Sequence, residues 1–133
     1  MLNLKSDKVI INKSAERVFD FLSDFNNFEN IMPEQIQDWQ STMTTCEFNI
    51  QGLTKLSMKI DKKIPYSKII IKPNGDTSFD YILTVNLYQL EEDKTEGQLI
   101  FDADVNPMLA MMAKKPLKNF INILSEKLKD NLK

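Results

Sequence analysis

Two aspartates near the end of the chain have the spacing of a pair that could bind a metal ion or exchange protons. Asp102 and Asp104 are two positions apart, and in a β-strand this spacing places both carboxylates on one face, about 7 Å apart. Such a pair can hold a cation or act as acid and base. However, Phe101, Ala103 and Val105 alternate with them and take the apolar face. We therefore expect both aspartates to lie on a solvated surface.

Nucleophilic and metal chemistry is limited by the residue types present. The sequence contains no histidine, which excludes Ser-His-Asp and Cys-His catalysis and the HExxH zinc helix. The single cysteine, Cys46, cannot form an internal disulfide or a CxxC site. With no histidine to activate its thiol, we expect Cys46 to be a small core residue. The sequence thus indicates no catalytic residue, no metal site and no cofactor.

Alternating apolar residues in the middle of the chain could line a pocket for an apolar molecule. They are Met58, Ile60, Ile69, Ile71, Phe79, Tyr81, Leu83 and Phe101. In a filled core these side chains would contact the covering helix directly. In a cavity protein they would line the pocket, with Tyr81 and Cys46 as rare polar groups that orient a ligand. Because a buried phenol normally finds a hydrogen-bond partner, the Tyr81 hydroxyl would bond either to a ligand or to the protein.

Three methionines stand close together after residue 107: Met108, Met111 and Met112. The apolar stripe of the C-terminal helix follows them and consists of Leu117, Phe120, Ile121, Leu124 and Leu128. At 100° per residue, a straight helix would turn the methionines almost opposite this stripe. Pro116 lies between the two groups and disfavours helical angles at the preceding residue. We therefore predict a break or strong kink near Pro116, after which the methionines either line a cavity mouth or join the ordinary core.

The charge balance argues against one class of partner. Lys and Arg number 17 against 19 acidic residues, for a formal net charge of -2. A protein that binds nucleic acid without regard to sequence would be strongly basic, so we expect no nucleic-acid partner. Locally, Lys114, Lys115 and Lys118 cluster beside Pro116. They could meet an anionic head group at a cavity mouth or could simply form a solvated helix face.

Size and apolar content indicate one domain over residues 1–133, since 42% of the residues are hydrophobic. No apolar stretch approaches the roughly 18 residues of a membrane span, and the charged beginning does not resemble a signal peptide. A single cysteine fits a reducing compartment. The sequence therefore predicts a cytoplasmic protein without integral membrane association.

The spacing of apolar positions predicts the elements. A first strand begins at Leu2, Ser14 can cap a helix over residues 15–22, and a second short helix covers residues 25–31. Antiparallel strands with one apolar face follow over residues 46–50, 56–60, 69–71, 79–87 and 99–105. Trp39 precedes these strands and is expected to pack at the sheet edge. Asn106 and Pro107 would begin the last helix.

This order resembles the START-like (SRPBCC) superfamily, the helix-grip fold of the birch-pollen allergen, lipid-transfer START domains and polyketide cyclases. The most telling segment is residues 14–25, SAERVFDFLSDF, which is similar to the family's opening S-x-E-x-V-F-x-F-L-x-D. This motif encodes helix geometry and no chemistry. The resemblance implies an α+β fold in which a curved antiparallel sheet wraps around a long C-terminal helix, with two short helices after the first strand. It also implies a cavity between sheet and helix that holds lipids, sterols, hormones or polyketides.

Three functions are compatible with this resemblance. The favoured one is binding or carriage of a hydrophobic, lipid- or polyketide-like molecule. The expected ligand contacts are the eight strand residues given above, together with Met108, Met112, Phe120 and Leu124. A cyclase- or dehydratase-type enzyme would have to use Tyr81, Tyr66 or carboxylates that the strand alternation turns toward solvent. We therefore lean against catalysis. A protein-interaction module, which would bind a protein partner, predicts a filled core and an exposed apolar patch.

Overall fold

The computed structural model describes residues 2–51, 55–75 and 79–132. Within them the strands are β1 (Leu2–Lys5), β2 (Val9–Ile11), β3 (Ile36–Ser41), β4 (Thr45–Ile50), β5 (Lys55–Ile64), β6 (Lys68–Pro73), β7 (Asp80–Glu91) and β8 (Lys94–Asp104). The helices are α1 (Ala15–Leu22), the 3-10 helix η1 (Phe25–Ile31) and α2 (Pro107–Asn131).

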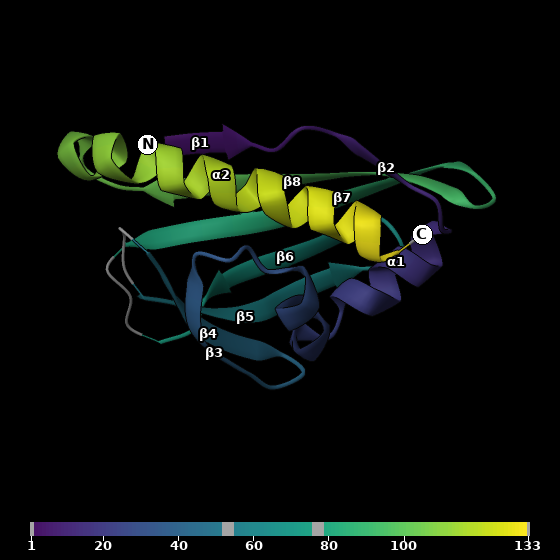
Figure 1. Cartoon of the computed structure of the whole chain (residues 1–133), viewed down its shortest axis with the longest axis horizontal. Helices are drawn as coiled ribbons and strands as arrows, with labels where there is room; N and C mark the ends of the chain where they lie inside the picture. The colour runs from purple at the N-terminus through teal and green to yellow at the C-terminus, as the bar shows by residue number, and fades with distance from the viewer. Residues whose placement is uncertain (1, 52–54, 76–78, 133) are drawn as a thin grey trace.

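All the strands belong to one antiparallel sheet. Its order is β1-β8-β7-β6-β5-β4-β3, and β2 pairs with β8 beyond the end of β1. The long helix α2 lies across one face of the sheet (Figure 1). The short helix α1 contacts β6, β7, β8 and η1. A curved antiparallel sheet that holds one long helix is the helix-grip α+β fold, so the predicted fold class is confirmed.

Edge strand β3 was not among the predicted strands. Its alternation is interrupted, because the pairing with β4 shifts register between Gln37 and Gln40, and Asp38 adopts a φ of 57°. This irregularity hides the period of two that identifies a strand. The predicted position of Trp39 at the sheet edge is confirmed, since β3 ends the strand order.

The predicted helix starts are confirmed by their capping bonds. The Ser14 hydroxyl accepts a hydrogen bond from the backbone N–H of Arg17 at 3.2 Å. The Asn106 side-chain oxygen accepts from the N–H of Leu109 at 2.8 Å, and Pro107 follows at the first helical position. These bonds satisfy donors that have no partner within the helix.

Of the break or strong kink predicted at Pro116, the break is wrong, because α2 runs without interruption from residue 107 to residue 131. Proline has no N–H, so the carbonyl of Met112 loses its helical donor. Met112 is 65% exposed, and on this side of the helix solvent can replace that donor. Ala113 and Leu117 are both fully buried and hold the helix against the sheet on either side of the proline.

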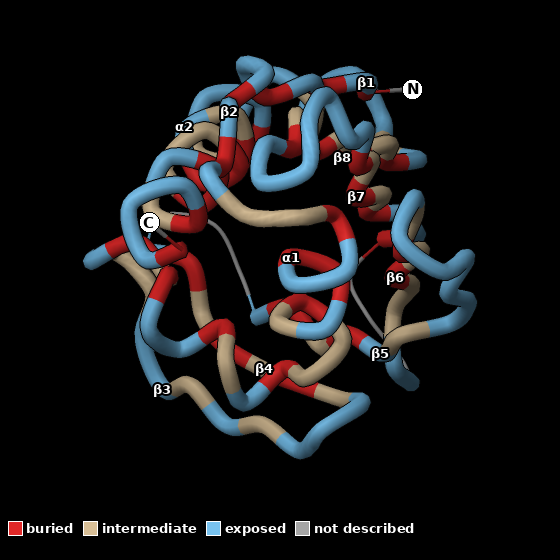
Figure 2. The backbone as a smooth tube through the Cα atoms, turned by 90° about the vertical axis from the view of Figure 1, so that its right-hand side faces the viewer, coloured by how far each residue is buried: buried red, intermediate tan, exposed pale blue. Residues whose placement is uncertain are grey.

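The apolar core lies between the sheet and α2. Along β7 and β8 buried residues alternate with more exposed ones, as the colours along the backbone show (Figure 2). One contiguous cluster of buried side chains includes residues from every strand except β3 and from all three helices. Among the described residues, neither α1 nor α2 has the length and apolar content needed to cross a membrane.

Candidate ligand-binding site

The strand residues expected to contact a ligand lie inside the core. Met58, Ile69, Ile71, Phe79, Tyr81, Leu83 and Phe101 are buried, as are Phe120 and Leu124 of α2, while Ile60 is half-buried. The strand residues among them share one side of the sheet, the side that faces α2. The parity of the strands therefore places them where a ligand between sheet and helix would touch them.

Stacked aromatic rings join the sheet edge to α2. The ring of Trp39 on β3 stacks on Phe48 of β4, with centroids 5.4 Å apart. Phe48 in turn stacks on Phe120 of α2, with centroids 5.6 Å apart. This three-ring column connects the edge of the sheet to the helix.

The two polar groups expected to orient a ligand, Tyr81 and Cys46, are occupied or inert. The Tyr81 hydroxyl donates a hydrogen bond to the carbonyl oxygen of Ser57 at 2.7 Å. Of the two expected partners, a ligand or a group of the protein, it therefore bonds to the protein. Burial raises the pKa of Tyr81, and the nearby Cys46 raises it further. Burial also raises the pKa of the Cys46 thiol to about 12. Cys46 is therefore a neutral core residue, as predicted.

The methionines of α2 lie on the surface. Met108, Met111 and Met112 are 75%, 83% and 65% exposed, so the expectation that they join the core is wrong. The reason is that an unbroken helix keeps its phase of 100° per residue across Pro116 and turns these side chains away from the core stripe.

The predicted solvated position of the aspartates agrees with the structure. Asp104 is exposed and Asp102, which is half-buried, accepts a hydrogen bond from the side chain of Asn3. Within residues 2–51, 55–75 and 79–132, no group of three or more His, Cys, Asp or Glu side chains is arranged to hold a metal ion.

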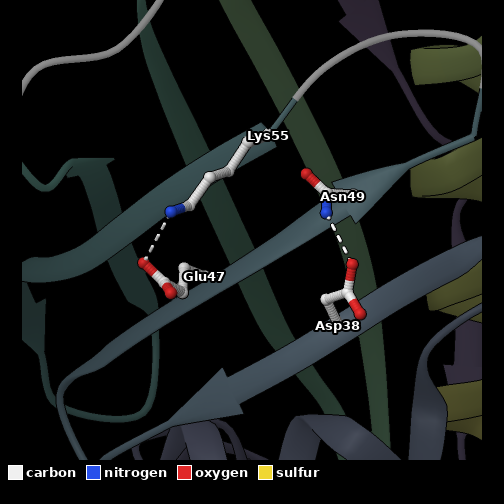
Figure 3. A network of polar contacts seen from close by, with 4 residues as sticks. All are labelled: Asp38, Glu47, Asn49 and Lys55. Carbon is white, nitrogen blue, oxygen red and sulfur yellow. Dashed lines mark hydrogen bonds and ion pairs between the residues drawn. The ribbon is translucent and has the colours of Figure 1, made fainter.

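The outer face of the sheet is polar. On β4 and β5, Glu47 forms an ion pair with Lys55 at 3.2 Å, and on β3 and β4 the Asn49 amide donates to the Asp38 carboxylate at 2.9 Å (Figure 3). Glu47 and Asn49 alternate with the buried Cys46, Phe48 and Ile50 along β4. An apolar ligand would thus meet the inner face and not this one.

A hollow of about 240 Å³ opens between α2 and the β3–β4 edge of the sheet. Its lining consists of Pro33, Gln35, Ile36, Ile50, Gln51, Lys115, Pro116, Asn119 and Phe120. Apolar side chains come from the strands and from Phe120, while amide groups and the Lys115 ammonium complete the lining. The hollow combines apolar walls with a few polar groups, which is the composition of small-molecule sites.

The sequence predicted Phe120 of this lining as a ligand contact, and gave Lys115 as a group that could meet an anionic head group at a cavity mouth. The helix side of the lining has the spacing i, i+3, i+4 at Pro116, Asn119 and Phe120, which places these residues on one face of the helix. This spacing could have predicted that they line a common site. On the strand side, Ile50 lies in a predicted strand, whereas Ile36 had no such signal because it belongs to the irregular strand β3 that the pattern missed.

Comparisons with known proteins bear on the fold. No family model matches the sequence, and the search of curated proteins finds no match. Solved structures do match over nearly the whole chain. A START superfamily protein from Mycobacterium smegmatis is 16% identical, with a TM-score of 0.71 over 98% of this chain and 96% of that one. The KanY protein is 12% identical, with a TM-score of 0.77 over 99% of both chains.

A further match is to the di-domain ARO/CYC BexL from the BE-7585A biosynthetic pathway. It is 11% identical, with a TM-score of 0.74 over 98% of this chain and 46% of that one. Identities this low show the fold and not the activity. Together with the sheet order and the position of α2, they show that the chain has a START/SRPBCC-like helix-grip fold.

Proposed function

We propose that this protein binds a hydrophobic small molecule, lipid- or polyketide-like, between the inner face of the sheet and α2. The observation that carries the proposal is the hollow beside Pro116, which lies directly against the apolar core through Phe120. The apolar part of a ligand would contact Ile36, Ile50 and Phe120. Its polar end would remain near the amides of Gln35, Gln51 and Asn119.

Phe120 is the proposed gate between the hollow and the interior. Its ring lines the hollow on one side and stacks on Phe48 in the core on the other. The hollow of about 240 Å³ is slightly smaller than the roughly 300–1,000 Å³ of typical ligand pockets. A ligand larger than the hollow would have to displace the Phe120 ring, which separates the hollow from the buried core.

Binding without turnover is favoured over a cyclase- or dehydratase-type reaction, although one structural neighbour is described as an ARO/CYC. The Tyr81 hydroxyl is engaged by Ser57 and has a raised pKa. The Cys46 thiol is neutral in the physiological range. Neither of these two groups is ionised at neutral pH, so neither is ready to serve as a base or a nucleophile.

The test is a titration of the purified protein with decanoate and, separately, with 1-anilinonaphthalene-8-sulfonate. Trp39 is the only tryptophan and belongs to the aromatic column beside the hollow, so its fluorescence should change with saturation as either compound binds. Isothermal titration calorimetry should show one site per chain.

Ile36→Lys would place a charge in the apolar wall and should weaken decanoate binding about tenfold or more. Ile10→Lys is the matched control, because Ile10 is 40% exposed on β2, away from the hollow. Equal affinities of the two variants, or no saturable binding of either compound to the natural protein, would refute the proposal.

A further inference from the structure

We infer that the first three turns of α2 form a docking surface for anionic phospholipid membranes. This surface, called here the Met-Lys face, consists of Met108, Met111, Met112, Lys114, Lys115 and Lys118. The Met-Lys face shares Lys115 with the hollow beside Pro116, but its three methionines are exposed and do not line that hollow.

Three apolar side chains and one lysine share the exposed stripe of the helix. At 100° per residue, Met108, Met111, Met112 and Lys115 fall within an arc of about 100°. The three methionines are 65–83% exposed. In the described part of the chain, Tyr88 at 67% is the one other large apolar side chain that reaches this range. They lie where α2 begins, at one end of the molecule beside β1 (Figure 1). Their flexible thioether side chains can insert among lipid head groups without a preformed partner.

Positive charge lies beside this stripe. Lys5, Lys114, Lys115 and Lys118 border a surface hollow of about 490 Å³ together with Met111. Lys118 donates a hydrogen bond to the backbone carbonyl of Lys5. Among the ion pairs of the described residues, none involves any of these four ammonium groups. A chain with a net charge of -2 thus gathers unpaired positive charge at one end.

Charge selects the partner. A second copy of the chain, docked through the same face, would bring six ammonium groups together at an apolar contact and would be repelled. An anionic bilayer offers phosphate groups to the lysines and an apolar layer to the methionines at once. Long lysine side chains can extend along the apolar boundary while their ammonium groups remain at the head groups. Both chemical features of the Met-Lys face are therefore matched by one surface.

The experiment is co-sedimentation with vesicles of phosphatidylcholine alone and of phosphatidylcholine with phosphatidylglycerol. We expect binding to the anionic vesicles only, and weaker binding as salt is raised. Each lysine near an anionic leaflet strengthens binding about fivefold. The triple variant Lys114→Gln, Lys115→Gln, Lys118→Gln should therefore bind on the order of 100-fold more weakly.

Matched variants separate location from net charge. Lys59→Gln, Lys62→Gln and Lys63→Gln together remove the same charge from exposed positions on β5, and this triple variant should keep most of the binding. Met108→Ser, Met111→Ser and Met112→Ser together should weaken binding about tenfold or more, because the apolar insertion is lost.

Three outcomes would overturn the inference: no binding to anionic vesicles, equal effects of the two lysine triples, or no effect of the methionine triple. In the last case simple electrostatic adsorption would explain the binding. Decanoate titration of the methionine variant distinguishes this inference from the proposed ligand site. None of the three methionines lines the hollow beside Pro116, so this variant should bind decanoate as the natural protein does.

Discussion

The rings of Phe48 and Phe120 stack with their centroids 5.6 Å apart and their planes inclined by 29°. This contact joins β4 near the sheet edge to the middle of α2, and both side chains are almost completely buried. Because Phe120 also lines the hollow beside Pro116, the same ring contributes to the stability of the fold and to the boundary of the proposed site.

Replacement of this ring should therefore be costly. Phe120→Ala is expected to lower the free energy of unfolding by about 3–5 kcal/mol, since it removes a buried aromatic side chain and leaves a cavity. Urea denaturation followed by circular dichroism measures the loss. Tyr88→Ala, at a position that is 67% exposed, is the control and should change stability by less than about 0.5 kcal/mol. A similar small loss for Phe120→Ala would mean that the core does not depend on the aromatic column.

The hydroxyl of Tyr81 should matter for stability and not for ligand binding. Tyr81→Phe removes the donor to the Ser57 carbonyl and should cost about 1 kcal/mol of unfolding free energy. Decanoate affinity should stay within about twofold, because this hydroxyl is already engaged by the protein. Tyr66→Phe, at a half-exposed position, is the matched control in the denaturation experiment. A large loss of affinity in Tyr81→Phe would instead assign the hydroxyl to the ligand.

Stability should fall in alkaline solution, in part because of Cys46. Its pKa is raised from 9.0 to about 12 in the folded protein, so above pH 9 the unfolded chain loses the thiol proton and the folded chain keeps it. The unfolded state then binds fewer protons, and the free energy of unfolding falls by about 1.4 kcal/mol at pH 10 through this group. Urea denaturation at pH 8 and pH 10 measures the change. Cys46→Ala should reduce the difference between the two pH values, and an equal difference in both proteins would contradict the role of the thiol.

Pro116 should destabilise the helix that contains it. Pro116→Ala restores an N–H donor for the Met112 carbonyl and removes the clash with the preceding turn, so unfolding should become harder by about 1–3 kcal/mol. Thermal denaturation compares this variant with Pro107→Ala, in which the proline occupies a favourable first helical position. A loss of stability in Pro116→Ala would show that packing of the proline ring against the hollow outweighs its effect on the helix.

The local pattern of the sequence determined most of the elements and the side of each that faces the core. Alternation along β4, β7 and β8 is a consequence of strand geometry, in which successive side chains point to opposite faces. The same parity correctly placed Asp102 and Asp104 toward solvent and Cys46 inside. Helix capping by Ser14 and Asn106 also depends only on neighbouring residues, so their sequence positions sufficed.

Contacts between distant segments were decided only by the tertiary structure. The hollow requires Ile36 and Ile50 to lie beside Pro116 and Phe120, and no local pattern encodes the distance between an edge strand and a helix that begins more than fifty residues later. The local preference of Pro116 predicted a break, but burial of Ala113 and Leu117 on either side keeps α2 continuous. Tertiary packing can thus override the preference of a single residue. The continuous helix then turns the three methionines toward solvent.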